Sequence, residues 1–129
     1  MTFLPEDRRG AGLAAEERAC RHLEGEGFTV VERNHRSAGG EIDIVARRGG
    51  LLVFVEVRSR EDAAFGSPEE TVGPRKRLRV AAAARRYLAA APPDSWKEAR
   101  FDVIAIEGSG ADAVLRHYEG AFDAKGKIL

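Results

Sequence analysis

The sequence predicts a mixed α/β fold, in which two main helices cover one sheet of about five strands. Two segments, residues 11–26 and 75–91, are rich in Ala, Leu, Arg and Glu, a composition typical of helices. Five shorter segments are rich in Val, Ile and Phe and are separated by glycine or polar residues, as expected for strands. The predicted order of elements along the chain is α-β-β-β-α-β-β.

The composition fits one domain over residues 1–129, with residues 1–9 as a flexible end. The formal net charge is +0, so a surface that binds nucleic acid must arise from local segregation of charge. Cys20 is the only cysteine, which rules out an intrachain disulfide and favours a reducing, cytoplasmic location. The sequence has no apolar run typical of a signal peptide or a membrane span, so no membrane partner is expected.

The first helix is expected over residues 11–26 and ends at Gly27, because glycine commonly terminates helices. At about 100° per residue, its apolar side chains centre on Glu16. These side chains are Leu13, Ala15, Ala19, Cys20 and Leu23. Glu16 therefore has two interpretations. It is either an acid delivered to a site on the sheet or a glutamate at the edge of a loosely packed helix.

The first strand is expected over residues 28–34, and a loop over residues 34–40 follows it. Two apolar segments come next, residues 41–48 and 51–58, and a Gly-Gly pair separates them. This pattern predicts a hairpin with a two-residue turn, in which both glycines adopt positive φ. Such a turn pairs Arg48 with Leu51 and thereby fixes the register of the hairpin.

The predicted register brings three carboxylates to one face of the hairpin. Asp43 lies opposite Glu56, and Glu41 lies opposite Arg58, because side chains alternate along each strand. The second strand is apolar on both faces, so Glu56 should be buried and should need a cation beside it. That cation is either Arg58 or a metal such as Mg²⁺, which typically binds one or two carboxylates. The alternative is a set of ordinary ion pairs on a solvated sheet face.

The second helix has a basic face. Arg75, Arg79 and Arg86 fall within about 40° of one another on a helical wheel, which forms a stripe suited to phosphates. Lys76 lies at the border of the apolar face, from which it would reach toward the sheet. The alternative is that this basic face is simply solvated.

The remaining segments flank these elements. Residues 61–74 are expected to form a loop that could cover a substrate. Strands are expected over residues 100–107 and 113–118, and residues 119–129 should form a tail with a short helical piece. Asp102, in the first of these strands, is either an acid that supports the site or a member of an ion pair.

Taken in order, these residues resemble the core of the PD-(D/E)xK nucleases. In that core an Asp begins one strand, and an acid, any residue and a lysine follow on the next. More closely, nearly the whole chain resembles the YraN-like family of uncharacterised bacterial proteins, which are similar to archaeal Holliday-junction resolvases. The resemblance rests on the Glu16 and Lys76 helices and on LEGEGF (23–28), RN (33–34), GGEIDIVA (39–46), VFVEVRSR (53–60), RFDV (100–103) and AF (121–122).

The resemblance implies a restriction-endonuclease-like fold with a metal centre. Asp43 and Glu56 would bind Mg²⁺ or Mn²⁺ together with the backbone carbonyl of Val57. Glu16 would bind the ion directly or through water. Glu41, close before Asp43, would assist.

The resemblance also assigns two cations. Lys76 matches a basic helix position of the resolvase group and would assist at the site. Arg58 stands where the nuclease core has lysine. A guanidinium stays protonated and cannot act as a general base. Arg58 could instead orient the attacking water or stabilise the negative charge that develops on the phosphate.

The function expected from this resemblance is a metal-dependent DNA endonuclease that acts on branched DNA. Cutting a four-way junction requires two active sites, so a homodimer would be expected. Two alternatives remain open. The chain could be a catalytically inactive module that binds nucleic acid on a nuclease scaffold, or a protein-interaction and assembly protein.

Overall fold

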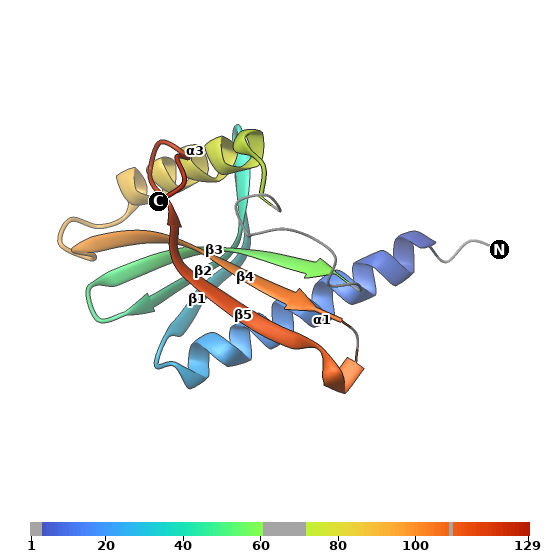
Figure 1. Ribbon diagram of the computed structural model, residues 1–129. Coiled ribbons are helices and arrows are strands. Elements are labelled where there is room, and N and C mark those ends of the chain that lie inside the picture. The colour runs from blue at the N-terminus through green and yellow to red at the C-terminus, as the bar shows by residue number, and fades with distance from the viewer. Residues whose placement is uncertain (1–3, 61–71, 109) are drawn as a thin grey trace.

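The computed structural model describes residues 4–60, 72–108 and 110–129, and its centre is one five-stranded sheet with the spatial order β1-β2-β3-β4-β5 (Figure 1). The strands are β1 (Thr29–Ser37), β2 (Gly40–Arg48), β3 (Leu51–Arg60), β4 (Glu98–Glu107) and β5 (Val114–Phe122). β3 and β4 pair in parallel, and the other neighbours pair antiparallel. The mixed five-stranded sheet predicted from the sequence is therefore confirmed.

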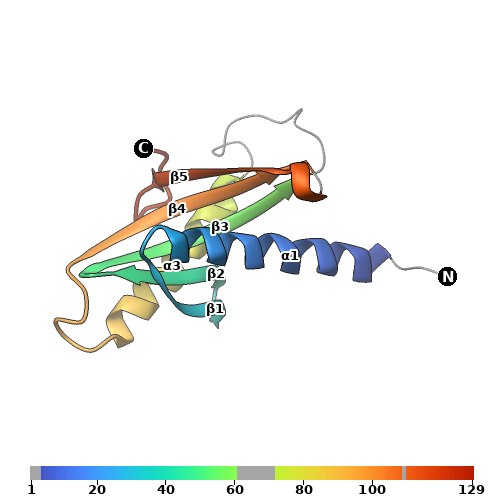
Figure 2. The same ribbon diagram turned by 90° about the horizontal axis from the view of Figure 1, so that it is seen from below.

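Two α-helices of the described chain cover opposite faces of this sheet (Figures 1 and 2). Helix α1 (Leu4–Gly25) buries Ala19 and Leu23 against one face, where Val53 and Val55 of β3 lie. Helix α3 (Pro74–Ala90) buries an alanine-rich stripe against the other face, where Leu52 and Phe54 lie. Strand β3 is thus buried on both sides, as its continuous apolar sequence predicted. A short 3-10 helix, η1 (Gly110–Asp112), precedes β5.

The β2–β3 hairpin has the predicted register, which runs from Arg48 paired with Leu51 to Ile44 paired with Val55. The turn differs in one detail from the prediction, because Gly49 alone adopts a positive φ, of 62°. Gly50 packs against Lys97, whose side-chain carbons would lie 3.2 to 3.3 Å from a Cβ at this position. Gly50 is therefore favoured by close packing rather than by its backbone angle.

Several boundaries differ from those predicted. Helix α1 begins at Leu4 rather than at residue 11, and β1 extends to Ser37 instead of ending at residue 34. The predicted loop therefore shrinks to a turn at residues 38–39, because pairing with β2 holds the rest of the segment extended. The expected short helix near residue 122 is wrong. Strand β5 continues to Phe122, whose ring stacks on Phe101.

The predicted covering loop falls mostly on residues 61–71, which lie outside the described residues. Strand β2 begins in direct contact with α3. A Cβ built on Gly40 would lie 2.2 Å from the carbonyl oxygen of Arg79, so only glycine fits there. This close approach fixes the basic helix against the end of β2 that carries Glu41 and Asp43.

Candidate active site

The candidate site lies where the β2–β3 pairing stops. The last paired residues are Ile44 and Val55, and the next residue on each strand is an acid. An Asp43 carboxylate oxygen accepts a hydrogen bond of 2.8 Å from the backbone N–H of Val57. A Glu56 carboxylate oxygen accepts a longer contact of 3.4 Å from the backbone N–H of Asp43. The two acids are thus neighbours, as predicted. Beyond the last regular pair of the two strands, each side chain accepts a hydrogen bond from a backbone N–H of the opposite strand.

Glu56 is a buried acid with an incomplete set of partners. Its side chain is 1% exposed, and its Oε1 atom has no hydrogen-bond partner among the described residues. The Nζ atom of Lys76 approaches Oε1 to 3.4 Å, which is an ion-pair distance without hydrogen-bond geometry. Burial and, to a smaller extent, the negative charge of Asp43 raise the pKa of Glu56 to about 8, against the opposing effect of Lys76.

Asp43 shares this environment. Burial raises its pKa above the usual range, while the hydrogen bond from Val57 and the charge of Lys76 act in the opposite direction. The negative charges of Glu16 and Glu41 also raise the pKa of Asp43, so both of these acids lie within electrostatic reach of it. The structure thus gathers negative charge around Asp43 and Glu56, and Lys76 is the cation that faces them.

Lys76 reaches toward the sheet from α3, as the helical wheel predicted. Besides Glu56, its Nζ atom lies 3.8 Å from Oε1 of Glu41. Glu41 is half-buried and also faces Arg36 on β1, whose Nε atom is 3.5 Å from its Oε2 atom. Glu41 therefore links the basic helix to the sheet edge beside the buried acids.

The position of Arg58 corrects the sequence interpretation. Neither the predicted pair with Glu41 nor the predicted pair with Glu56 forms, and in the described part of the chain Arg58 has no ion-pair partner. The regular β2–β3 pairing ends at Ile44, so the strands no longer hold Glu41 and Arg58 opposite each other. Lys76 takes the place of Arg58 as the cation paired with Glu56 and Glu41. A catalytic role of Arg58 stays a prediction.

Glu16 lies near the acids but is held by β1. Its Oε1 atom accepts a hydrogen bond of 3.1 Å from Asn34 and lies 3.7 Å from a guanidinium nitrogen of Arg33. Its side chain is 16% exposed, so it is neither fully buried nor a free surface acid. Over residues 4–60, 72–108 and 110–129, no three acids, histidines or cysteines form a group that could hold a metal. A metal site that includes Glu16 with Asp43 and Glu56 therefore stays a prediction.

The pair formed by Asp43 and Glu56 nevertheless fits a divalent cation. An unpartnered buried oxygen on Glu56 and two acids with raised pKa are what an ion of opposite charge would stabilise. Mg²⁺ in particular often binds through one or two carboxylates and keeps several water molecules. Glu16 and the carbonyl of Val57 stay predicted as additional ligands.

The basic stripe of α3 lies at the surface beside this site. Arg75, Arg79 and Arg86 are exposed, and one guanidinium N–H of Arg86 donates a hydrogen bond to the carbonyl of Ala38. Arg77, on the same helix, is different because it is 8% exposed and donates to the carbonyls of Val72 and Gly126. The helix therefore carries structural as well as surface arginines, and its sequence alone did not separate them.

A second buried acid, Asp102 on β4, proves to belong to an ion-pair network. It accepts two hydrogen bonds from Arg100 at 2.8 and 2.9 Å, one from His117 at 2.7 Å and one from the backbone of Gly120 at 3.0 Å. These contacts outweigh the effect of burial and lower the pKa of Asp102. His117 in turn contacts His22 of α1 at 3.0 Å. The ion pair expected as one alternative for Asp102 is thus confirmed. Its partners were not identified from the sequence because they include residues of α1 and β5.

Comparisons with known proteins agree with the resemblance to the YraN-like family. The family described as "Uncharacterised protein family UPF0102" matches residues 15–106. A UPF0102 protein of Anaeromyxobacter sp. (strain Fw109-5) is 46% identical over 121 residues, which cover 94% of this chain and 90% of the relative. A UPF0102 protein of Myxococcus xanthus is 46% identical over 120 residues, covering 93% and 94%. A third, from Syntrophotalea carbinolica, is 40% identical over 126 residues, covering 98% and 99%.

The described helices contain no segment that is both long and apolar enough to cross a membrane. The family match covers the elements that carry Glu16, Asp43, Glu56 and Lys76. The relatives match this chain over nearly its whole length, at identities well above the level that unrelated proteins reach. The chain therefore belongs to UPF0102, the YraN-like family of uncharacterised bacterial proteins.

Proposed function

We propose that this protein is a metal-dependent DNA endonuclease that hydrolyses phosphodiester bonds, with branched DNA as its substrate and the cytoplasm as its location. The observation that carries the proposal is the buried, incompletely paired carboxylate of Glu56 beside Asp43, under a basic helix. A buried acid with a strongly raised pKa destabilises the fold, so such groups are concentrated at functional sites. The resemblance to PD-(D/E)xK nucleases gives this pair of acids a specific role.

In this proposal Asp43 and Glu56 hold Mg²⁺ or Mn²⁺, with Glu16 and the carbonyl of Val57 as further ligands. A bound metal supplies positive charge at the scissile phosphate and lowers the pKa of a coordinated water. The hydrogen bond from the Val57 N–H to Asp43 orients the carboxylate for this role. Glu56 must lose its proton to become a ligand, which a raised pKa makes dependent on pH.

Two cations of the chain contribute beside the acids. Lys76 neutralises Glu56 and Glu41 in the absence of metal, and its ammonium group lies where it can contact a phosphate oxygen once the acids are engaged. Arg58 keeps its charge at every working pH and has no ion pair in the described structure, so its guanidinium is available to a phosphate. Glu41 assists by orienting Lys76.

The DNA backbone would lie along α3. Arg75, Arg79 and Arg86 form an exposed stripe, and Lys76 lies between this stripe and the acids. A cleft of about 320 Å³ lined by Arg36, Arg79 and Glu41 leads from the helix toward the site. Binding through these side chains should weaken steeply with salt, because it releases counterions from the DNA. Cutting both strands of a four-way junction would further require a homodimer with two such sites.

The test is a cleavage assay on labelled duplex, single-stranded and four-way-junction DNA, with Mg²⁺, Mn²⁺ or EDTA. We expect metal-dependent cutting by the wild type and at least about a hundredfold slower cutting by Asp43→Asn, since metal ligands are required for this chemistry. Glu98→Gln, an exposed change on β4, is the matched control and should cut normally. Equal cutting by Asp43→Asn and the wild type would overturn the proposal.

The ion pair of Lys76 with Glu56 favours a second candidate function. If Lys76 permanently closes the acidic site, the protein is a nucleic-acid-binding module that does not cleave. This alternative predicts junction binding that is weakened in Arg75→Gln and Arg79→Gln, without Mn²⁺ binding at any pH at which the protein is folded. Metal binding by the wild type that is lost in Asp43→Asn would exclude it.

A further inference from the structure

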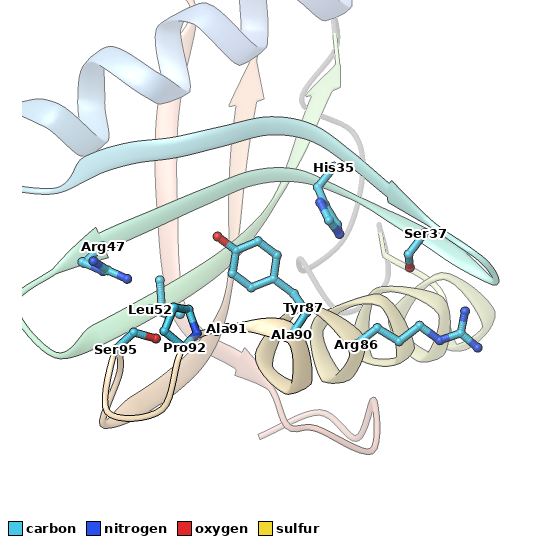
Figure 3. Close-up of a pocket in the computed structure, with 10 residues that line it drawn as sticks. All are labelled: His35, Ser37, Arg47, Leu52, Arg86, Tyr87, Ala90, Ala91, Pro92 and Ser95. Carbon is cyan, nitrogen blue, oxygen red and sulfur yellow. The ribbon is translucent and has the colours of Figure 1, made fainter.

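A second cavity, separate from the buried acids, lies between the C-terminal end of α3, strands β1 and β2, and the turn at residues 92–95 (Figure 3). Its volume is about 460 Å³, within the range of about 300 to 1,000 Å³ typical of small-molecule sites. Its polar lining consists of His35, Ser37, Arg47, Arg86, Tyr87 and Ser95, and no acid is among the described residues that line it. Its two arginines therefore favour an anionic ligand, whereas His35 is paired with Glu32 outside the lining, at 2.7 Å.

An aromatic side chain stands in the middle of this cavity. The ring of Tyr87 projects from α3 between the strands and the 92–95 turn (Figure 3). It makes edge-to-face contacts with His35, at 5.2 Å between ring centres, and with Phe54, at 5.7 Å. These two nearly perpendicular contacts hold the ring in one orientation, so it offers a fixed surface for stacking.

Two arginines lie at opposite ends of the lining (Figure 3). Arg47 on β2 is exposed and has no ion-pair partner among the residues described. Arg86 on α3 is exposed and uses one N–H on the carbonyl of Ala38, which leaves further donors of its guanidinium for a ligand. A guanidinium suits phosphate oxygens because two parallel N–H groups can bind them together.

Two hydroxyl groups in the lining lack partners. The Oγ atoms of Ser37 and Ser95 are buried and form no hydrogen bond with any residue that the structure describes. Together with Oε1 of Glu56, they are the three buried side-chain atoms in this condition in the described chain. An unpaired buried hydroxyl destabilises the folded protein, and rotation about Cα–Cβ lets a serine turn toward a ligand in the cavity.

The cavity also adjoins the candidate active site. Ser37 lines both this cavity and the cleft that contains Arg79 and Glu41. Glu41 in turn faces Lys76, which contacts Glu56. A strand bound in that cleft could therefore place one nucleotide in the cavity while an adjacent phosphate lies near the buried acids.

We propose that this cavity binds a nucleotide, with the base stacked on Tyr87 and the phosphate held by Arg47 or Arg86. The shared chemistry is a planar aromatic base that carries a phosphate, which either a free nucleotide or an unpaired nucleotide of a DNA strand supplies. The strand form of the proposal rests on the proposed endonuclease function and makes the cavity the place where an unpaired base beside a branch point is recognised. The free-nucleotide form is independent of that function.

The test measures binding in EDTA, so that metal and cleavage play no part. The probes are the four deoxynucleoside monophosphates, inorganic phosphate, a fully paired duplex and the same duplex with one unpaired nucleotide. We expect a monophosphate to bind more tightly than inorganic phosphate, or the duplex with the unpaired nucleotide to bind more tightly than the paired one. The first result identifies a free nucleotide as the ligand and the second identifies a nucleotide within a strand.

Matched variants then assign binding to the cavity. Tyr87→Leu should weaken binding about tenfold, within the range reported for loss of one base–aromatic stack, whereas Tyr87→Phe should bind as the wild type does. Arg47→Gln should weaken binding several-fold and Arg48→Gln should not, because Arg48 packs over Phe28 and does not line the cavity. Arg86→Gln and Arg85→Gln form a second pair, since each arginine is exposed and donates to one backbone carbonyl.

The proposal is overturned if no probe binds, or if the cavity variants bind as tightly as their matched controls. Should Tyr87→Leu fail to fold, the exposed Arg47 and Arg48 variants decide the matter. Failure of the proposed endonuclease function gives a different result. In that case Asp43→Asn leaves Mn²⁺ binding and cleavage unchanged, and the cavity variants still lose nucleotide binding. The reverse pattern would reject the cavity and leave the endonuclease intact.

Discussion

Two fully buried carboxylates, Glu56 and Asp102, lie on the paired strands β3 and β4 and have opposite electrostatic properties. Their exposed fractions are 1% and 0%, so burial does not distinguish them. Asp102 receives hydrogen bonds from Arg100, His117 and the backbone of Gly120, and its pKa is lowered. Glu56 has one long contact from a backbone N–H and one ion pair, and its pKa is raised to about 8.

We infer that the hydrogen-bond donors around a buried acid, rather than its burial, distinguish a structural role from a functional one. A fully paired carboxylate stabilises the fold as long as its partners remain in place. An incompletely paired carboxylate costs free energy in the folded state, and a cation that binds there recovers it. We therefore infer that Asp102 has a structural role, and we propose that Glu56 is part of a binding site.

The largest effect is expected from Asp102→Asn. This change removes the charge that pairs with Arg100 and His117 and places an amide among groups that donate hydrogen bonds. We expect the free energy of unfolding at pH 7 to fall by about 3 kcal/mol, as is typical when one partner of a buried ion pair is removed. Urea denaturation measures this change. Glu119→Gln, which alters an exposed partner of Arg100, is the control and should cost less than about 1 kcal/mol.

Glu56→Gln should raise the free energy of unfolding of the metal-free protein, whereas Asp102→Asn lowers it. The amide needs no counter-charge, so the variant should be more stable than the wild type by roughly 1 to 3 kcal/mol at pH 8. Urea denaturation in EDTA checks this, with Glu98→Gln as the control. A loss of stability in Glu56→Gln as large as that in Asp102→Asn would erase the distinction between the two acids.

The two acids should also differ in pH dependence. The folded-state pKa of Glu56 exceeds its ordinary value of 4.5, so folding takes up a proton and stability falls as pH rises from about 4.5 to about 8. The folded-state pKa of Asp102 is below its ordinary value of 3.8, so its contribution is present above that pH and is lost as pH falls through the folded-state pKa. The difference in free energy of unfolding between each variant and the wild type, measured against pH, should change in these two separate pH ranges. A change in the same pH range for both variants would contradict the different roles inferred for the two acids.

The smallest effect concerns the cation beside Glu56. Lys76→Gln removes the charge that lowers the pKa of Glu56, so this pKa should rise further above its usual range. Arg58→Gln should leave the titration of Glu56 unchanged, because Arg58 is not its partner. Carbon NMR of the Glu56 carboxyl group measures both. A larger rise in Arg58→Gln than in Lys76→Gln would restore the pairing predicted from the sequence.

Much of this arrangement is local and could be read from the sequence. The Gly49-Gly50 turn and the alternation of side chains gave the register that makes Asp43 and Glu56 neighbours, and helical periodicity turned Lys76 toward the sheet. The point at which the β2–β3 pairing stops could not be read. The pairing stops near the place where Gly40 contacts Arg79 of α3, and this contact depends on tertiary packing.

Other features depend on residues that are distant in the chain. The hydrogen-bond donors to Asp102 include His117, fifteen residues away on β5, and no local sequence pattern predicts such a contact. The extension of β1 over His35 likewise depends on pairing with β2 rather than on the polar, loop-like sequence of that segment. The sequence also suggested Arg58 as the partner of Glu56, whereas the structure has Lys76 there. Arg58 lies on the same strand as Glu56, but Lys76 comes from α3, so this pairing depends on tertiary packing.

We propose that Glu56 and Asp43 form a divalent-cation site, and Mn²⁺ binding measured by isothermal titration calorimetry at pH 8 tests this site most directly. The wild type should bind Mn²⁺ and release protons on binding, because acids with raised pKa must ionise to become ligands. Asp43→Asn and Glu56→Gln should lose this binding while remaining folded, and Glu98→Gln should retain it. Folded wild-type protein that binds no Mn²⁺, or a Glu56→Gln variant that binds it equally well, would contradict the account.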